Sequence, residues 1–200
     1  MTLYKFRSLQ NQKDYDRIID IIENGFYCND FLGFNDMNEG VYINNKDNTY
    51  ITFSEKQKYK ICSFSGVKAL NSELMWGHYA NTGRGVAIEI NVEDSSNIRE
   101  INYNTNDNLN TMEKILTNKS KEWVHEDEYR YLSTNNLPNN KVSIGTITKI
   151  YFGTPYEALT NYEKIRMKHD KLKEYYKFKD TLKKACITKD ILCEDFKFNV

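Results

Sequence analysis

Residues 3–7 read Leu-Tyr-Lys-Phe-Arg, and this alternation of apolar and charged side chains predicts a β-strand. In such a strand Tyr4 and Phe6 occupy one face, while Lys5 and Arg7 occupy the other. If the apolar face is buried, both cations point toward one region of the protein. The strand is therefore expected to supply both core side chains and a positively charged surface.

A mixture of strands and helices is predicted on either side of this stretch. Helical spacing of apolar residues indicates a helix over 14–23 that stops at Gly25, a short helix over 70–80, and helical structure from Met112 to Trp123. A basic segment at about 156–183 carries a further amphipathic helix to about Tyr176. Strands are expected over 49–53, 59–64, 86–90, 126–132, 141–144 and 148–152, with closing strands at 184–188 and 196–198.

The order of these elements has no regular βαβ rhythm. It predicts one α+β domain over residues 1–200, with a mixed, mainly antiparallel β core and flanking helices. Residues 102–110 are almost wholly polar and are expected to form a loop.

Composition excludes several classes of protein. The 28 Lys and Arg residues balance 28 Asp and Glu residues, which argues against a polyanion binder held by bulk charge. Hydrophobic residues make up 40% of the chain, so it has enough apolar mass for a globular core. No apolar run approaches the roughly 18 residues of a membrane span, and residues 1–11 lack a signal-peptide stretch, so a cytoplasmic protein without membrane contact is expected.

The cysteines and histidines do not suggest a metal site. Cys28, Cys62, Cys186 and Cys193 contain no C-x-x-C pair, so they are interpreted as buried free thiols and neither a zinc site nor a disulfide framework is predicted. The three histidines, His78, His125 and His169, also lack metal-ligand spacing.

Two groups of side chains could bind a ligand. Arg7, with Lys5, could grip phosphate oxygens, since a guanidinium group donates two parallel hydrogen bonds; the alternative is a solvated strand face. Ser63 and Ser65 share a strand face near a strand end, where ligands often bind. No G-x-S-x-G elbow surrounds them, so a nucleophilic serine is not supported, and they could instead cap the helix that follows.

A pair of carboxylates is the third candidate. Glu126 and Glu128 are expected on one strand face, where their repulsion must be compensated by cations or a ligand. Such a pair could stabilise a sugar cation and activate an acceptor. The structural alternative is that Glu128 pairs with Arg130.

The helix at 70–80 and the basic helix carry weaker signals. His78 or Tyr79 could reach a pocket, whereas Met75 and Trp76 are interpreted as core residues. The basic helix is interpreted as a solvated face, with a nucleic-acid partner as the alternative.

Seven motifs together resemble a bacterial family called domain of unknown function 2971. They are LYKFRS (3–8), FND (34–36), CSFS (62–65), MWGHYA (75–80), GVAIE (85–89), EDEYR (126–130) and IYFG (150–153). The resemblance covers most of the chain. The chain departs from the family at Met37, where the family usually has proline.

The order of the motifs also resembles the ADP-ribosyltransferases of the Arg/Ser/Glu type. Those enzymes have an Arg on the first strand, a Ser-Thr-Ser on a later strand and a Glu-x-Glu further on, on split β-sheets. Arg7, the Ser-Phe-Ser at 63–65 and the Glu-Asp-Glu at 126–128 follow this order. Phe64 in place of Thr is a departure that weakens the serine assignment.

The resemblance implies a function and roles for single residues. Arg7 would grip the pyrophosphate or a nearby ribose of NAD, the substrate. Ser63 would orient the nicotinamide ribose and hold Glu128, and Ser65 is a further cofactor-binding residue. Glu128 would stabilise the cationic sugar, and Glu126 would position or deprotonate the acceptor; Tyr79 or His78 would contact the ligand. No metal is expected.

The chain is therefore predicted to be a NAD-consuming ADP-ribosyltransferase-like enzyme that modifies a protein or nucleic acid. The family resemblance implies a role in phage defence or bacterial conflict, as a toxin with a neutralising partner protein. The alternatives are a non-enzymatic ligand- or partner-binding module of a defence system, and a nucleic-acid-processing protein.

Overall fold

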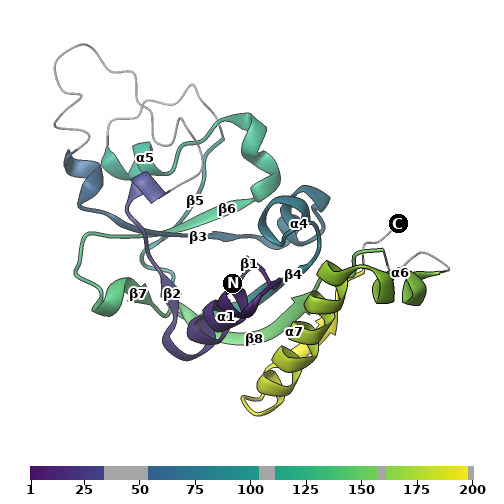
Figure 1. The fold of residues 1–200 in the computed structure, drawn as a ribbon. Helices are drawn as coiled ribbons and strands as arrows, with labels where there is room; N and C mark the ends of the chain where they lie inside the picture. The colour runs from purple at the N-terminus through teal and green to yellow at the C-terminus, as the bar shows by residue number, and fades with distance from the viewer. Residues whose placement is uncertain (34–53, 104–110, 157–160, 198–200) are drawn as a thin grey trace.

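A seven-stranded sheet forms the centre of the protein in the computed structural model, which describes residues 1–33, 54–103, 111–156 and 161–197 (Figure 1). The strand order is β5-β6-β3-β1-β4-β8-β9, and all neighbours are antiparallel except β8 and β9. The predicted α+β class with a mainly antiparallel mixed sheet is confirmed.

The strands of this sheet are β1 (Thr2–Ser8), β3 (Lys60–Ser65), β4 (Gly85–Val92), β5 (Ile98–Glu100), β6 (Glu128–Ser133), β8 (Gly145–Phe152) and β9 (Leu192–Asp195). Two short strands, β2 (Phe26–Tyr27) and β7 (Lys141–Val142), pair separately. The α-helices with bounds inside the described residues are α1 (Gln12–Asn24), α3 (Val67–Leu70), α4 (Glu73–Tyr79), α5 (Met112–Leu116), α6 (Tyr162–Lys168) and α7 (Asp170–Ile187). The 3-10 helices are η1 (Phe31–Gly33), η2 (Lys121–Glu126) and η3 (Pro138–Asn140).

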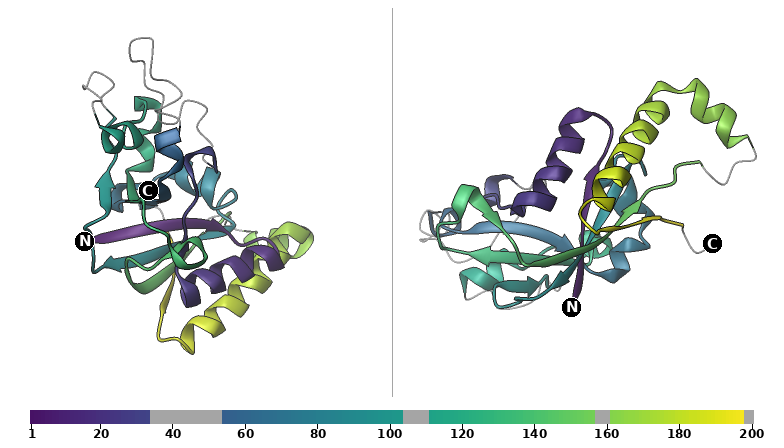
Figure 2. Two further views of the ribbon diagram at one scale, coloured as in Figure 1. Left: turned by 90° about the vertical axis from the view of Figure 1, so that its left-hand side faces the viewer. Right: turned by 90° about the horizontal axis from the view of Figure 1, so that it is seen from below.

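Helices cover both faces of the sheet. The α1 and α7 helices lie side by side on one face (Figure 2), where Leu3 of β1 joins a core with Ile18 and Tyr175. On the other face Tyr4 and Phe6 pack in a cluster with residues of α3 and α4. The alternation predicted for residues 3–7 is therefore confirmed, because successive side chains of β1 enter opposite cores.

The strand β1 is joined very differently to its two neighbours. All seven of its residues pair with β4, whereas its pairing with β3 is confined to Tyr4 opposite Ser65. The two strands diverge beyond this pair. The resemblance implies split sheets, whereas the structure has one seven-stranded sheet with limited pairing between β1 and β3.

Several predicted boundaries were wrong. The helix expected over 70–80 is α4, which begins only at Glu73 because the Ser72 side chain accepts a hydrogen bond from the Met75 N–H, and Leu70 is instead the last residue of α3. The helical segment after Met112 ends at Leu116, and Trp123 belongs to η2. The strand predicted over 141–144 is β7, which ends at Val142, and the strand predicted over 148–152 is β8, which begins at Gly145.

The C-terminal segment also differs from the prediction. Residues 184–187, expected as a strand, are the last turn of α7, where Cys186 continues the buried stripe of that helix. The closing strand is β9, which ends before Phe196. The basic helix is divided into α6 and α7, and Lys168, Lys171 and Lys173 are exposed, as on a solvated face.

Three other expectations fall on parts of the chain outside the description. The strand at 49–53 and the FND motif at 34–36 lie wholly outside the described residues, as does most of the loop at 102–110. Among the helices that are described, none combines the length and apolar character that a membrane crossing requires.

Candidate functional site

A cavity of about 300 Å³ lies where β1 and β3 diverge. Residues 4–7 of β1 and 61–65 of β3 form two of its walls, and Tyr79, Lys119, Glu126 and Glu128 complete a polar part of the lining. Successive residues of β1 border the cavity, although their side chains alternate between the two faces of the strand. It brings together six predicted site residues: Arg7, Ser63, Ser65, Tyr79, Glu126 and Glu128.

The backbone of β3 shows how the opening is held apart. Ile61 exchanges both backbone hydrogen bonds with Asn29, at 2.7 and 2.8 Å, in place of a partner on β1. The Ser63 carbonyl accepts a hydrogen bond from the Lys5 ammonium group. If β1 and β3 were paired along their whole length, a backbone N–H of β1 would donate to this carbonyl, and here the Lys5 side chain of β1 donates instead.

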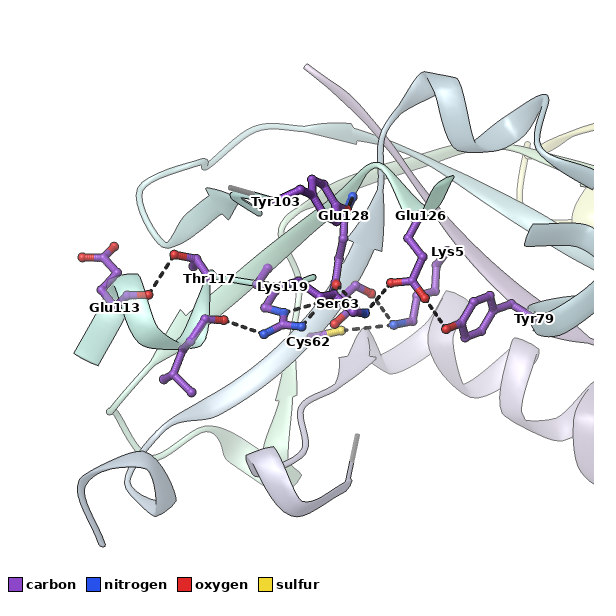
Figure 3. A network of polar contacts seen from close by, with 12 residues as sticks. Lys5, Cys62, Ser63, Tyr79, Tyr103, Glu113, Thr117, Lys119, Glu126 and Glu128 are labelled. Carbon is purple, nitrogen blue, oxygen red and sulfur yellow. Dashed lines mark hydrogen bonds and ion pairs between the residues drawn. The ribbon is translucent and has the colours of Figure 1, made fainter. Parts of the chain in front are cut away.

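Glu128 lies at the start of β6 in a dense network of cations (Figure 3). Arg130 donates from Nε to Oε1 at 2.8 Å and from Nη2 to Oε2 at 3.2 Å, and Lys119 Nζ lies 3.1 Å from Oε2. The carboxylate is 3% exposed and Arg130 is fully buried. The pairing of Glu128 with Arg130, raised above as the structural alternative, is thus observed.

The cations decide the ionisation of Glu128. Burial acts to raise its pKa, but the charge and hydrogen bonds of Arg130, with the charge of Lys119, outweigh burial and lower the pKa to about 2. The Glu128 N–H also donates to the Tyr103 hydroxyl at 2.9 Å. This carboxylate is therefore ionised and held in place at neutral pH.

Glu126 does not share a strand face with Glu128, contrary to the prediction. It is the last residue of η2, and Asp127, with φ of 45°, turns the chain before β6 begins. Glu126 accepts hydrogen bonds from the Tyr79 hydroxyl and from Lys119 Nζ, the latter at 2.6 Å. The two carboxylates nevertheless meet, because both contact the same ammonium group.

Lys119 is the residue that the sequence analysis missed. It is 5% exposed, it bridges Glu126 and Glu128, and its Nζ lies 4.6 Å from the centre of the Trp123 ring. The signal that could have found it was the expectation that two adjacent carboxylates need a compensating cation. The sequence has 28 Lys and Arg residues, and this expectation does not say which of them is the cation.

Lys5 and Arg7 form the basic wall of the cavity. Both are partly buried, and burial lowers the pKa of each. Arg7 Nη1 donates to the Phe6 carbonyl at 3.3 Å, and Lys5 contacts Ser63 and Cys62 of β3. Within the described part of the chain, no ion pair joins either cation to a carboxylate. These two charges are available to an anionic ligand.

The two serines do not cap the next helix. Gly66 is the N-cap of α3 and has no side chain, and the Asp127 carboxylate accepts from the Lys68 N–H at 3.1 Å instead. Ser65 is buried opposite both Tyr4 and Glu128. The Ser63 hydroxyl oxygen is buried without a hydrogen-bond partner among the described residues, and it lies close enough to Glu128 to help lower the pKa of that carboxyl.

His78 does not line the cavity. It is exposed on α4, with its ring centre 6.5 Å from that of His125. Leu74 is also exposed, while Met75 and Trp76 are buried as predicted. The next residue along, Tyr79, reaches the cavity because it leaves the helix about 100° further round.

The thiols are unpaired, with Cys28, Cys62 and Cys186 buried and Cys193 partly exposed. The prediction of buried free thiols therefore needs correction at Cys193, which lies on the edge strand β9. No group of three or more potential metal ligands occurs in the described ranges.

Comparisons of the chain with protein-family models, with curated proteins and with solved structures found no match. The resemblances described above therefore remain predictions, and the site is interpreted from its own geometry.

Proposed function

We propose that this protein binds NAD in the cavity between β1 and β3 and transfers its ADP-ribose group to a macromolecule, as an ADP-ribosyltransferase-like enzyme. One observation carries the proposal. Basic side chains of β1, serines of β3 and the carboxylates at 126 and 128 border a single cavity, although they are far apart in the sequence. The order of the same motifs in the sequence supports it independently.

The charge distribution favours a ligand with a pyrophosphate group. Lys119 and Arg130 balance the charges of Glu126 and Glu128, which leaves Lys5 and Arg7 in excess at the cavity. Burying two cations without counter-ions is unfavourable, and a bound dianion would relieve that cost. The guanidinium group of Arg7 suits paired phosphate oxygens.

The carboxylates would then act on the ribose. Glu128 is ionised at neutral pH and would stabilise positive charge on the sugar as nicotinamide leaves with the electrons of the glycosidic bond. Glu126, held by Tyr79 and Lys119, would orient the acceptor or take its proton. The acceptor would be a protein or a nucleic acid, with water giving simple hydrolysis.

The test is nicotinamide release and transfer of labelled ADP-ribose by the purified full chain. Glu128→Gln is expected to lower the rate by about 100-fold or more, as the loss of an electrostatic stabiliser does. Arg7→Gln is expected to weaken binding of NAD, measured by the NAD-dependent rise in melting temperature. Glu100→Gln, on β5 and outside the cavity lining, is the matched control and should behave as wild type.

A second candidate function has its own support. Both carboxylates are engaged by Lys119 or Arg130, so the cavity could bind an anionic ligand without chemistry. A melting temperature raised by NAD, lost in Arg7→Gln, with no nicotinamide released, would favour this binding module. The absence of both nicotinamide release and an NAD-dependent thermal shift would reject the proposed enzyme.

A further inference from the structure

Two cysteines face each other beside the cavity. Asn29 and Ile61 exchange both of their backbone hydrogen bonds in an antiparallel bridge. The neighbouring residues across this bridge are Cys28 and Cys62. They occupy the adjacent pair of positions, which carries no mutual backbone hydrogen bonds. The Cys28 N–H accordingly points away from β3 and donates to the Asn140 carbonyl at 2.7 Å.

This arrangement suits a disulfide. Antiparallel pairs of that kind have Cα atoms about 4.5 Å apart with both side chains on one face. Disulfides require Cα atoms about 4.4–6.8 Å apart. Each residue is buried, at 1% exposed for Cys28 and 3% for Cys62. A bond between the sulfurs would therefore need little movement of the backbone.

The two sulfurs have different surroundings. Cys62 lines the cavity, and Lys5 Nζ lies 3.9 Å from its Sγ. The neighbouring Cys28 thiol, with the charges of Lys5 and Arg7, lowers the pKa of Cys62, while the proximity of Cys62 and burial raise the pKa of Cys28. One member of the pair is thus suited to react as a thiolate and the other to remain a thiol.

We propose that Cys62 and Cys28 form a redox-active pair, in which a hydroperoxide that enters the cavity oxidises Cys62 and Cys28 then closes an intrachain disulfide. The Cys62 thiolate attacks the peroxide O–O bond, takes one oxygen as a sulfenic acid and releases the other as hydroxide or alkoxide. The Cys28 sulfur then attacks the Cys62 sulfur, the S–S bond forms, and water leaves with the Cys28 proton. The peroxide is reduced by two electrons, and the inference does not depend on the proposed function.

The experiment treats the reduced full chain with hydrogen peroxide and maps its disulfides by mass spectrometry without reduction. The expected product contains the Cys28 and Cys62 peptides joined, with the loss of two hydrogens. In Cys28→Ser, oxidation is expected to stop at a sulfenic acid on Cys62, which dimedone traps. Cys62→Ser is expected to form neither the disulfide nor this sulfenic acid. Two results would overturn the proposal. One is that disulfides joining Cys28 or Cys62 to Cys186 or Cys193 form as readily as the Cys28–Cys62 disulfide, and the other is that Cys62 is not oxidised.

A further variant tests the role of the neighbouring cation. Lys5→Met is expected to slow oxidation of Cys62 at pH 7 by about tenfold and to shift its pH dependence upward. Lys58→Met, an exposed lysine away from the cavity lining, is the matched control. Cys193, which lies partly exposed on β9, reports on general reactivity in the same samples and should be unaffected by either change. An equal effect of Lys5→Met on Cys62 and Cys193 would contradict the proposed activation.

Discussion

At the scale of single residues, the site depends on a buried set of charges that satisfy one another. Arg130 is fully buried, yet its guanidinium group bonds to both oxygens of Glu128 and to the Leu116 carbonyl. Removing one member would leave an uncompensated charge inside the protein, which costs more than an exposed ion pair contributes. Lys119 extends the same network to Glu126.

The low pKa of Glu128 predicts how stability depends on pH. The folded-state pKa of about 2 lies below the reference value of 4.5, so ionised Glu128 stabilises the fold above about pH 4.5. This contribution is lost as the pH falls from 4.5 toward 2, with a slope of at most about 1.4 kcal/mol per pH unit. Urea unfolding of wild type and Glu128→Gln between pH 6 and pH 3 measures it.

Glu128→Gln is expected to be less stable at pH 6 and to show a flatter pH dependence than wild type. Glu100→Gln serves again as the control, since Glu100 is exposed. Parallel pH profiles for wild type and Glu128→Gln would contradict the prediction.

At the scale of secondary structure, local capping decides where α1 begins and how it follows β1. The Asn11 side chain accepts from the Asp14 N–H at 3.0 Å, and Asp14 in turn accepts from Ser8 Oγ at 2.7 Å. The helix ends at Gly25, whose φ of 88° favours glycine and whose Cα lies too close to Val142 for a side chain. These contacts fix the direction of α1 across the sheet.

Asn11→Ala is expected to lower the free energy of unfolding by about 1 kcal/mol, because the first turn of α1 loses its side-chain acceptor. Asn11→Asp should retain most of the stability, since aspartate is an equally good cap. Lys13→Ala, exposed in the same turn, is the control. The midpoint of urea unfolding measures the difference, and equal midpoints for Asn11→Ala and wild type would exclude the cap.

At the scale of the whole molecule, α7 connects the C-terminal segment to the centre of the sheet. Tyr175 is fully buried, and its hydroxyl donates to the Gly153 carbonyl at 2.6 Å, with the Gly85 carbonyl 3.3 Å away. These carbonyls lie at the end of β8 and the start of β4, so one side chain links the helix to two central strands. The helix is therefore expected to unfold together with the sheet.

Tyr175→Phe is expected to destabilise the protein by about 1–3 kcal/mol, because it leaves a buried carbonyl without its donor. Tyr156→Phe removes an exposed hydroxyl and is the control. Helical circular dichroism and tryptophan fluorescence should give coincident transitions in both variants. Separate transitions in wild type would show that α7 is not part of one cooperative unit.

Local patterns in the sequence determined a large part of this structure. Alternation predicted β1, β3 and the apolar part of β4, helical spacing with Gly25 predicted α1, and together they indicated an α+β sheet. They also identified most of the candidate residues, since charged and hydroxyl side chains inside a strand stand out against its apolar pattern. The boundaries failed where a cap or a left-handed residue intervened, as at Ser72 and Asp127.

Only the tertiary structure decided what these residues do to one another. Three features of the site depend on pairings between distant segments. They are the divergence of β1 from β3, the position of Glu126 in η2 instead of the predicted strand, and the contacts of Lys119 with both carboxylates. The pairing of Cys28 with Cys62 has the same origin in the bridge between Asn29 and Ile61. Sequence periodicity reports which face of an element is buried, whereas long-range hydrogen bonding and charge compensation select which faces meet.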